Sequence, residues 1–298
     1  MGISMCHTPP SNVLFSFLPI DKGAGKQYNK TNKNIKGAFD MSARRVLVTG
    51  SRGGCGKSSV AAGVAWALAL AGQKTALIDL DLAERSLDMY LGCEDRVVYD
   101  LGDLLVGQTR VRDVALCPEG ADGLYLIPGA YHLRRPPTKE ETERVFSAVE
   151  SELGVSYLIV DTSSAADPSV KLSAGLCHEG IMVMCDSPLS LRSAASLMDT
   201  LHEFGMDDVR MVVNRFSMDP KKPTDLRAMI DATGMRLLGI VPECSVFARE
   251  QDAGVSALRA KACPGVACAL SNIAARLTGE HRPLLTGISC RRKKLLDI

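Results

Sequence analysis

A glycine-rich turn between a short apolar strand and a helix constrains this chain more than any other feature. The turn lies within VLVTGSRGGCGKSS, residues 46–59, and contains Gly53, Gly54 and Gly56. Glycines let consecutive backbone N–H groups converge on an anion, and the N-terminus of the following helix adds its positive dipole end. Lys57 can then reach the β- and γ-phosphates of a nucleotide, and the Ser58 hydroxyl suits Mg²⁺. The motif therefore predicts a nucleoside triphosphate site.

Apolar, strand-like runs alternate with helical stretches along most of the chain. The first strand and an alanine-rich helix at 60–71 are followed by runs at 75–80, 123–128, 157–161, 180–185, 209–214 and 237–241. Thr138 and Glu141 have the spacing of a capping box and predict a helix over 138–153. Continuous apolar strands separated by amphipathic helices are typical of a parallel sheet buried on both faces. We therefore expect an α/β fold, a doubly wound, mainly parallel sheet with helices on both faces.

Composition and charge favour a globular protein and exclude several other classes. Of the 298 residues, 46% are hydrophobic and 23% are charged, which is enough apolar material for a core. No linker-like stretch follows residue 45, so we expect one domain there. The net charge of +1 argues against nucleic acid or an acidic membrane as a partner of the whole surface. No apolar run is long enough to span a bilayer.

The ten cysteines are scattered, mostly in apolar stretches, and no two of them form a C-x-x-C pair. Cys263 and Cys268 lie closest together in the sequence after the N-terminal segment, but no histidine or further cysteine clusters with them. We therefore predict reduced thiols of a cytosolic protein rather than a metal site or a disulfide framework.

Residues 1–40 differ from the rest of the chain and are predicted to be disordered or absent from the native protein. Asn, Lys, Gly and Ser dominate this segment, which has no periodicity. A secretory signal is disfavoured because no basic residue precedes the apolar piece 13–20, and N-myristoylation because Cys6 stands where Ser or Thr is required. Met41, directly before the first strand, is the alternative start of translation. An intact native mass that includes residues 1–40 would refute that start.

Aspartates end two of the predicted strands. Asp79 and Asp81 close the second strand, and Asp161 closes the run YLIVD. A lone aspartate is often a helix cap or a turn residue, but acids after strands that neighbour a phosphate loop are expected of a nucleoside triphosphatase. One carboxylate can orient the attacking water and another can hold Mg²⁺ through its hydration shell.

With these motifs in place, the sequence resembles the MinD/ParA family of deviant P-loop ATPases, and within it the septum-site-determining members. The resemblance rests on residues 52–59, 78–88, 91–101, 126–130, 212–215, 237–243 and 275–283. The stretch 91–101 is the part that is specific to those members rather than to P-loop proteins in general. The resemblance implies a P-loop NTPase fold of MinD/ParA type and a P-loop ATPase domain over 41–283.

The resemblance also implies an ATP-driven switch. Proteins of this family form a sandwich dimer around two ATP molecules, hydrolyse slowly and separate when a partner stimulates them. Lys57, Asp81 and Arg52 would be catalytic: the P-loop lysine, the residue that orients the water, and the counterpart of the signature lysine that reaches across the dimer. Ser58 and Asp161, the acid of the second switch, would hold Mg²⁺, and Asn214 would contact adenine. The ATP-binding positions carried over are Ser51, Arg52, Gly53, Gly54, Cys55, Gly56, Lys57, Ser58, Ser59, Asn214 and Arg215.

Four departures from the family pattern concern the γ-phosphate end of the site. They are Ser51 for the first loop glycine, Arg52 for the signature lysine, Ser86 for an asparagine, and Ala165 for a glycine. Arginine keeps the charge of lysine but is longer and forked, and alanine adopts a positive φ less easily than glycine. The departures leave ATP binding better supported than hydrolysis, and an ATP-binding scaffold with little hydrolysis is the alternative.

The basic tail 284–298 is either an amphipathic membrane-targeting helix or a frayed, solvated terminus. Its apolar residues share a broad helical face, although Arg291 and Arg292 intrude on it and Gly287 weakens it. The four consecutive basic residues 291–294 would favour an anionic membrane surface. In septum-site-determining members such a tail grips the membrane when the protein dimerises.

The resemblance therefore implies a homodimer on ATP binding, a division-site regulator as partner, and a cytoplasmic protein that is peripheral at the inner face of the cell membrane. Nucleic acid is not expected as a partner. A relative that positions flagella, pili or DNA remains an alternative, against which the stretch 91–101 argues. The missing C-x-x-C disfavours an iron–sulfur carrier.

Overall fold

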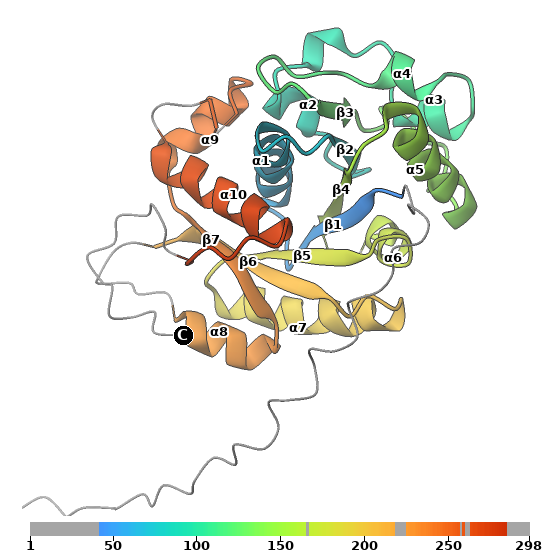
Figure 1. Ribbon diagram of the computed structural model, residues 1–298. Coiled ribbons are helices and arrows are strands. Elements are labelled where there is room, and N and C mark those ends of the chain that lie inside the picture. Colours follow the sequence, from blue (N-terminus) through green and yellow to red (C-terminus); the bar gives the residue numbers. More distant parts are fainter. Residues whose placement is uncertain (1–41, 165–166, 218–224, 257, 260–262, 285–298) are drawn as a thin grey trace, which may run out of the picture. The chain divides into compact units, whose positions relative to one another are not determined.

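Seven strands form a single sheet in which every ladder is parallel. The computed structural model describes residues 42–164, 167–217, 225–256, 258–259 and 263–284. The sheet order is β3-β2-β4-β1-β5-β6-β7, as Figure 1 shows. The strands are β1 (Arg44–Gly50), β2 (Thr75–Leu80), β3 (Leu124–Ile127), β4 (Tyr157–Ser164), β5 (Glu179–Met184), β6 (Val209–Phe216) and β7 (Arg236–Pro242).

Helices cover both faces of this sheet. One face carries α1 (Lys57–Leu70), α2 (Leu87–Tyr90), α9 (Ser245–Asp252) and α10 (Pro264–Leu277). The other carries α3 (Leu101–Leu105), α4 (Val111–Val114), α5 (Lys139–Leu153), α6 (Pro168–Ala174), α7 (Pro188–Glu203) and α8 (Leu226–Thr233). A short 3₁₀ helix, Glu94–Arg96, follows α2. The predicted doubly wound parallel sheet is confirmed, and all seven expected strands are present.

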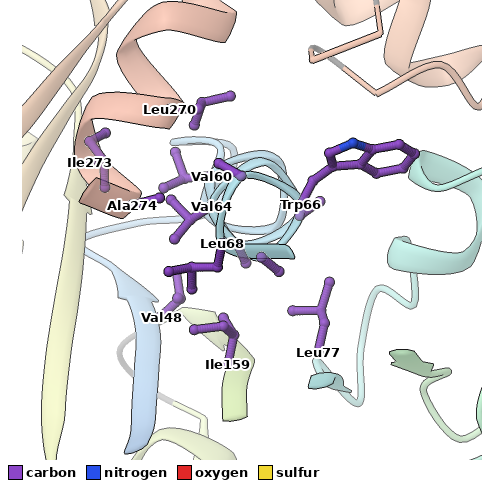
Figure 2. Packing of buried hydrophobic residues seen from close by; sticks show 14 of the residues in the cluster. Val48, Val60, Val64, Trp66, Leu68, Leu77, Ile159, Leu270, Ile273 and Ala274 are labelled. Carbon is purple, nitrogen blue, oxygen red and sulfur yellow. The ribbon is translucent and has the colours of Figure 1, made fainter. Parts of the chain in front are cut away.

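Alternating side chains of the central strand enter opposite halves of the core. Val46 and Val48 of β1 pack with α1 and α10, whereas Leu47 packs with α6 and α7 on the other face. A central strand buried on both faces needs apolar residues at every position, which is why β1 reads as a continuous apolar run. In Figure 2, Val64 and Leu68 of α1 lie toward β1 and α10, while Trp66 points the other way.

Helix α10 packs against α1, and Gly63 of α1 leaves the space that Leu270 of α10 occupies. A Cβ atom on Gly63 would stand 2.5 Å from Cδ1 of Leu270. Figure 2 shows Leu270 of α10 on this side of α1, whereas Ile273 lies farther from α1 and packs against Gly239 of β7. Helix α10 is thereby packed against the helix that begins at the glycine-rich turn.

Local signals in the sequence predicted the start of α5 correctly and the start of α1 three residues too late. The Thr138 side chain accepts a hydrogen bond from the Glu141 backbone N–H at 3.2 Å, and the Glu141 carboxylate accepts one from the Thr138 N–H at 2.8 Å. This capping box begins α5 one residue after Thr138, as predicted. Helix α1 begins at Lys57, three residues earlier than expected, because the glycine-rich turn leads directly into it.

The predictions for residues 1–40 and for Ala165 lie outside the described residues, as does nearly all of the tail 284–298. Within the described part, no helix is both long and apolar enough to cross a membrane. The eight described cysteines are all free, in line with the predicted thiols. They do not all belong to the core, because Cys117 is exposed.

Candidate nucleotide-binding site

The glycine-rich turn, residues 51–56, joins the carboxyl end of the central strand β1 to the N-terminus of α1. Gly54 and Gly56 have φ values of 72° and 89°, in the left-handed region that glycine adopts without strain. A Cβ atom on Gly56 would also overlap the side-chain amide of Asn214. Glycine is therefore required at position 56 both by the backbone conformation and by the space. The turn has the form of a phosphate-binding loop.

Contacts from neighbouring strands hold this loop in place. The Asn214 side chain, at the end of β6, donates a hydrogen bond to the Cys55 carbonyl at 2.9 Å. The Ser51 N–H donates to the Val183 carbonyl of β5 at 3.2 Å. The Ser51 hydroxyl lies 2.5 Å from the hydroxyl of Ser190 on α7. Asn214 thus holds the loop through the Cys55 carbonyl. The predicted contact of Asn214 with adenine stays a prediction.

Lys57 and Ser58 open α1, and the buried carboxylate of Asp161 lies close to them. Asp79 on β2 and Asp161 on β4 are in register, and neither side chain is exposed. Neither carboxylate oxygen of Asp161 has a hydrogen-bond partner of normal geometry among the described residues. The Ser58 hydroxyl and the Lys57 ammonium nevertheless lie close enough to act on the pKa of Asp161. The predicted lysine, serine and acid are therefore brought together at one point.

Burial raises the pKa of both carboxyl groups. Loss of water raises the pKa of Asp161 well above its ordinary value, and the charge of Asp79 adds to the shift, while Ser58 and Lys57 oppose it. Burial raises the pKa of Asp79 to about 7, although three backbone N–H groups act in the opposite direction. Two like charges deprived of water disfavour ionisation of both groups. A bound cation would therefore stabilise the ionised forms of these two carboxyl groups.

Asp79 and Asp81 also organise the chain after β2. The Asp79 carboxylate accepts hydrogen bonds from the N–H groups of Asp81, Ser86 and Leu87 at 3.1 to 3.2 Å. The Asp81 carboxylate accepts from the N–H groups of Ala83 and Glu84 at 3.1 and 3.0 Å. Asp81 is almost buried at the same end of the sheet. Its predicted orientation of a water molecule is not tested by these contacts.

The residues fit Mg²⁺ only in company with a phosphate ligand. Among the described residues there is no group of three or more His, Cys, Asp and Glu side chains that could hold a metal ion. The carboxylate of Asp161 and the hydroxyl of Ser58 lie close together, and both are oxygen ligands of the kind that a hard cation prefers. Mg²⁺ characteristically combines one or two protein ligands with substrate phosphates and water. The donor set is therefore compatible with the predicted Mg²⁺ ligands.

A pocket of about 650 Å³ lies beside the loop, within the range of about 300–1,000 Å³ that small-molecule sites occupy. It is lined by Arg52, Gly53, Gly54, Cys55, Cys185, Asp186, Ser187, Arg215, Ser217 and Glu243. Arg215 has a φ of 52°, the sole positive value outside glycine in the described part of the chain. Strained backbone of this kind concentrates at binding sites. Predicted residues Arg52 and Arg215 therefore share a pocket next to the phosphate loop.

Several residues of this region have no signal in the sequence. The Ser59 hydroxyl donates to Gln251 of α9 at 2.7 Å, so this predicted ligand position is joined to a distant helix. Ser190 and Glu243, which support the loop and line the pocket, lie far from the turn along the chain. Residues that meet only through strand order and helix packing leave no local pattern to recognise.

Comparisons with known proteins agree with this geometry. Residues 46–256 match the CobQ/CobB/MinD/ParA nucleotide binding domain. The septum site-determining protein MinD of Neisseria meningitidis serogroup B is 25% identical over 254 residues, which cover 81% of this chain and 93% of that protein. A chain of the MinC:MinD cell division protein complex of Aquifex aeolicus has a TM-score of 0.75 and 24% identity, and covers 81% of this chain and 98% of that one. MinD of Pyrococcus horikoshii, solved with Mg-ADP, has a TM-score of 0.70 and 21% identity over 79% of this chain and 96% of its own.

A glycine-rich loop on the central strand of a doubly wound parallel sheet, with a lysine and buried acids around it, defines a P-loop nucleotide-binding protein. The family match covers more than half of the chain. This protein belongs to the MinD/ParA family of P-loop ATPases, and within it the chain is MinD-like.

Proposed function

We propose that this protein is an ATP-driven spatial switch. Its ATP-bound homodimer associates with the inner face of the cell membrane and recruits a division-site regulator, and ATP hydrolysis resets it. The observation that carries the proposal is the fully buried carboxylate of Asp161 close to Lys57 and Ser58, with the carboxylate of Asp79 beside it in register on β2. Support for a division-site regulator as the partner comes from the similarity to the MinD protein of Neisseria meningitidis and to a chain of the Aquifex aeolicus MinC:MinD complex.

In this proposal the loop and the acids divide the work on ATP. Backbone N–H groups of residues 53–58 and the Lys57 ammonium bind the phosphates. Ser58 and Asp161 would hold Mg²⁺, which when bound neutralises charge on the phosphates. Asp81 orients the attacking water, and the pocket lined by Arg215 and Glu243 receives the nucleoside. A bound cation would favour the ionised form of Asp161, as the nearby Lys57 ammonium already does.

Arg52 acts across the dimer on the phosphates of the partner subunit's nucleotide. Its exposed position on the loop leaves the guanidinium available for such a contact. Arginine in the place of the family's lysine also supports a second function, an ATP-binding scaffold that hydrolyses little. This function follows if the longer, forked side chain fits the partner site poorly. Arg52→Lys restores the family residue and separates the two functions. If Arg52→Lys hydrolyses bound ATP faster than the wild type in a single turnover, the arginine slows hydrolysis and the scaffold function is supported.

The tail 284–298 supplies the membrane contact. Its four consecutive basic residues, 291–294, would each contribute about 1 kcal/mol near an anionic surface. Two tails in one dimer bind more strongly than one because the second binding event is intramolecular. Membrane association should therefore require the nucleotide state that dimerises.

The test follows nucleotide, oligomeric state and membrane together. Purified protein is mixed with Mg-ATP or Mg-ADP, its mass is measured by light scattering, and its sedimentation with anionic vesicles is measured with and without residues 289–298. We expect a dimer, and sedimentation that depends on the tail, with Mg-ATP but not with Mg-ADP. Lys57→Ala should abolish both, whereas Lys171→Ala, an exposed lysine on α6, should change neither. Failure to bind Mg-ATP, or binding by a strictly monomeric protein, contradicts the proposal.

A further inference from the structure

Two cysteines that are far apart in the sequence meet beside the candidate nucleotide pocket. Cys244 and Cys263 are 19 positions apart, and their sulfur atoms lie 3.2 Å from each other. Cys244 is the N-cap residue of α9 and Cys263 that of α10. A disulfide bond measures about 2.05 Å, so the sulfurs need to approach by about 1.2 Å to bond.

The two thiols differ in the way that a peroxide-reactive pair requires. Burial acts to raise the pKa of Cys244, but the hydrogen bond from the Cys263 thiol and the N–H groups of Phe247 and Val246 outweigh it, so the pKa is lowered. Burial and the neighbouring Cys244 raise the pKa of Cys263 to about 11. Cys244 is partly exposed, whereas Cys263 is buried. A low-pKa, accessible thiol with a second thiol in contact is the arrangement of a reactive and a resolving cysteine.

We infer that Cys244 and Cys263 are a reversible redox pair, which a hydroperoxide closes into a disulfide, and that this closure weakens nucleotide binding. The second part rests on the proposed function. The Cys244 thiolate attacks one oxygen of hydrogen peroxide, the O–O bond breaks, and Cys244 becomes a sulfenic acid. The departing hydroxide forms water with the proton that the Cys244 thiol released on ionisation. The Cys263 sulfur then attacks the Cys244 sulfur, the S–O bond breaks, and the departing hydroxide takes the Cys263 proton. Two thiols and one peroxide thus give one disulfide and two water molecules.

The cysteine pair is linked to the nucleotide site through a neighbouring residue in the sequence and through one hydrogen bond of α9. Glu243, the residue directly before Cys244, lines the pocket beside the phosphate loop. The helix that Cys244 begins, α9, carries Gln251, which accepts the hydrogen bond from Ser59 at the start of α1. Movement of Cys244 toward α10 would therefore displace Glu243, which lines the pocket, and Gln251, which accepts the hydrogen bond from α1. The pocket is formed in the dithiol state, so the disulfide state should bind nucleotide less well.

The first arm of the test concerns the bond itself and needs no nucleotide. Full-length protein is treated with hydrogen peroxide, free thiols are alkylated, and an unreduced digest is mapped by mass spectrometry. We expect one cross-linked peptide that joins Cys244 to Cys263, lost on adding dithiothreitol. Cys244→Ser should abolish it, and Cys117→Ser, which removes an exposed thiol elsewhere, should not. If Cys244 and Cys263 stay alkylated in wild-type protein while Cys117 is oxidised, the inference is overturned, whether or not the variants fold.

The second arm measures Mg-ATP affinity of the reduced and the cross-linked protein by calorimetry. We expect the dissociation constant to rise about fivefold or more on cross-linking, the lower end of usual coupling between two sites. Dithiothreitol should restore it, and Cys263→Ala should show no response to peroxide. Equal affinity in the two redox states overturns the coupling. Absence of binding in the reduced protein would instead contradict the proposed function, so the two failures are distinguishable.

Discussion

Replacing Asp161 by asparagine should stabilise the nucleotide-free protein at alkaline pH while weakening its binding of Mg-ATP. Asp161 is fully buried, and its carboxylate oxygens have no hydrogen-bond partner of normal geometry among the described residues. Asparagine has nearly the same shape and carries no charge. The substitution therefore removes a desolvated carboxylate from a site that also contains Asp79.

The size of the gain follows from the neighbouring carboxyl group. Burial raises the pKa of Asp79 from 3.8 to about 7, and three units correspond to about 4 kcal/mol between the two protonation states. Loss of water also raises the pKa of Asp161 well above its ordinary value, and the charge of Asp79 adds to the shift, while Ser58 and Lys57 oppose it. An unpaired buried amide costs roughly 1–3 kcal/mol, and Lys57 loses a neighbouring carboxylate. The net gain at pH 8 should be roughly 1–3 kcal/mol.

The pH dependence gives the prediction its sign. Because the pKa of Asp161 is raised in the folded state, the folded protein binds more protons than the unfolded chain above the ordinary carboxyl pKa. Wild-type stability is therefore lost as pH rises from about 4 toward the folded-state pKa. The advantage of Asp161→Asn should be small near pH 4 and should increase toward pH 8.

Urea unfolding at pH 5 and pH 8 without nucleotide measures this difference. Asp225→Asn is the matched control, because Asp225 caps α8 through the Ala228 N–H at 3.0 Å and asparagine caps equally well. At 100 times its dissociation constant, Mg-ATP should stabilise the wild type by about 2.7 kcal/mol and the variant by less. The reasoning is refuted if Asp161→Asn is less stable than the wild type at pH 8, or if its advantage is the same at both pH values.

Two further predictions concern single residues whose contacts are defined. Gly56→Ala should lower the free energy of unfolding by about 1–3 kcal/mol and impair nucleotide binding, because a Cβ there meets the Asn214 amide at a φ of 89°; Gly53→Ala, where a Cβ meets nothing within 4 Å, should change thermal stability little. Thr138→Ala should cost about 1 kcal/mol in urea unfolding because it removes the acceptor of the Glu141 N–H in the capping box of α5. An unchanged unfolding midpoint in Gly56→Ala or Thr138→Ala would contradict the respective contact.

Sequence reasoning found the residues of one glycine-rich turn from their spacing, and it found distant residues such as Asp161 from their place in strand motifs. The glycines, Lys57 and Ser58 occur within one turn, so their spacing alone indicates a phosphate loop. The contact of Asn214 with the loop carbonyl of Cys55 was not foreseen, because 159 positions separate the two residues and no periodicity relates them. The meeting of Cys244 and Cys263 was likewise unpredictable, since sequence proximity drew attention to Cys263 and Cys268 instead.

The sequence by itself determined the local structure of this protein: seven apolar strands, a helix capped at Thr138, and a loop that glycine alone can form at Gly56. Hydrogen bonds between near neighbours and backbone sterics act over a few residues, so a linear pattern records them. Only the tertiary structure decided that β2 lies beside β4, which sets Asp79 against Asp161 and deprives both of water. A raised pKa is a property of the space around a group, and that space is built by chain segments that the sequence does not show to be adjacent.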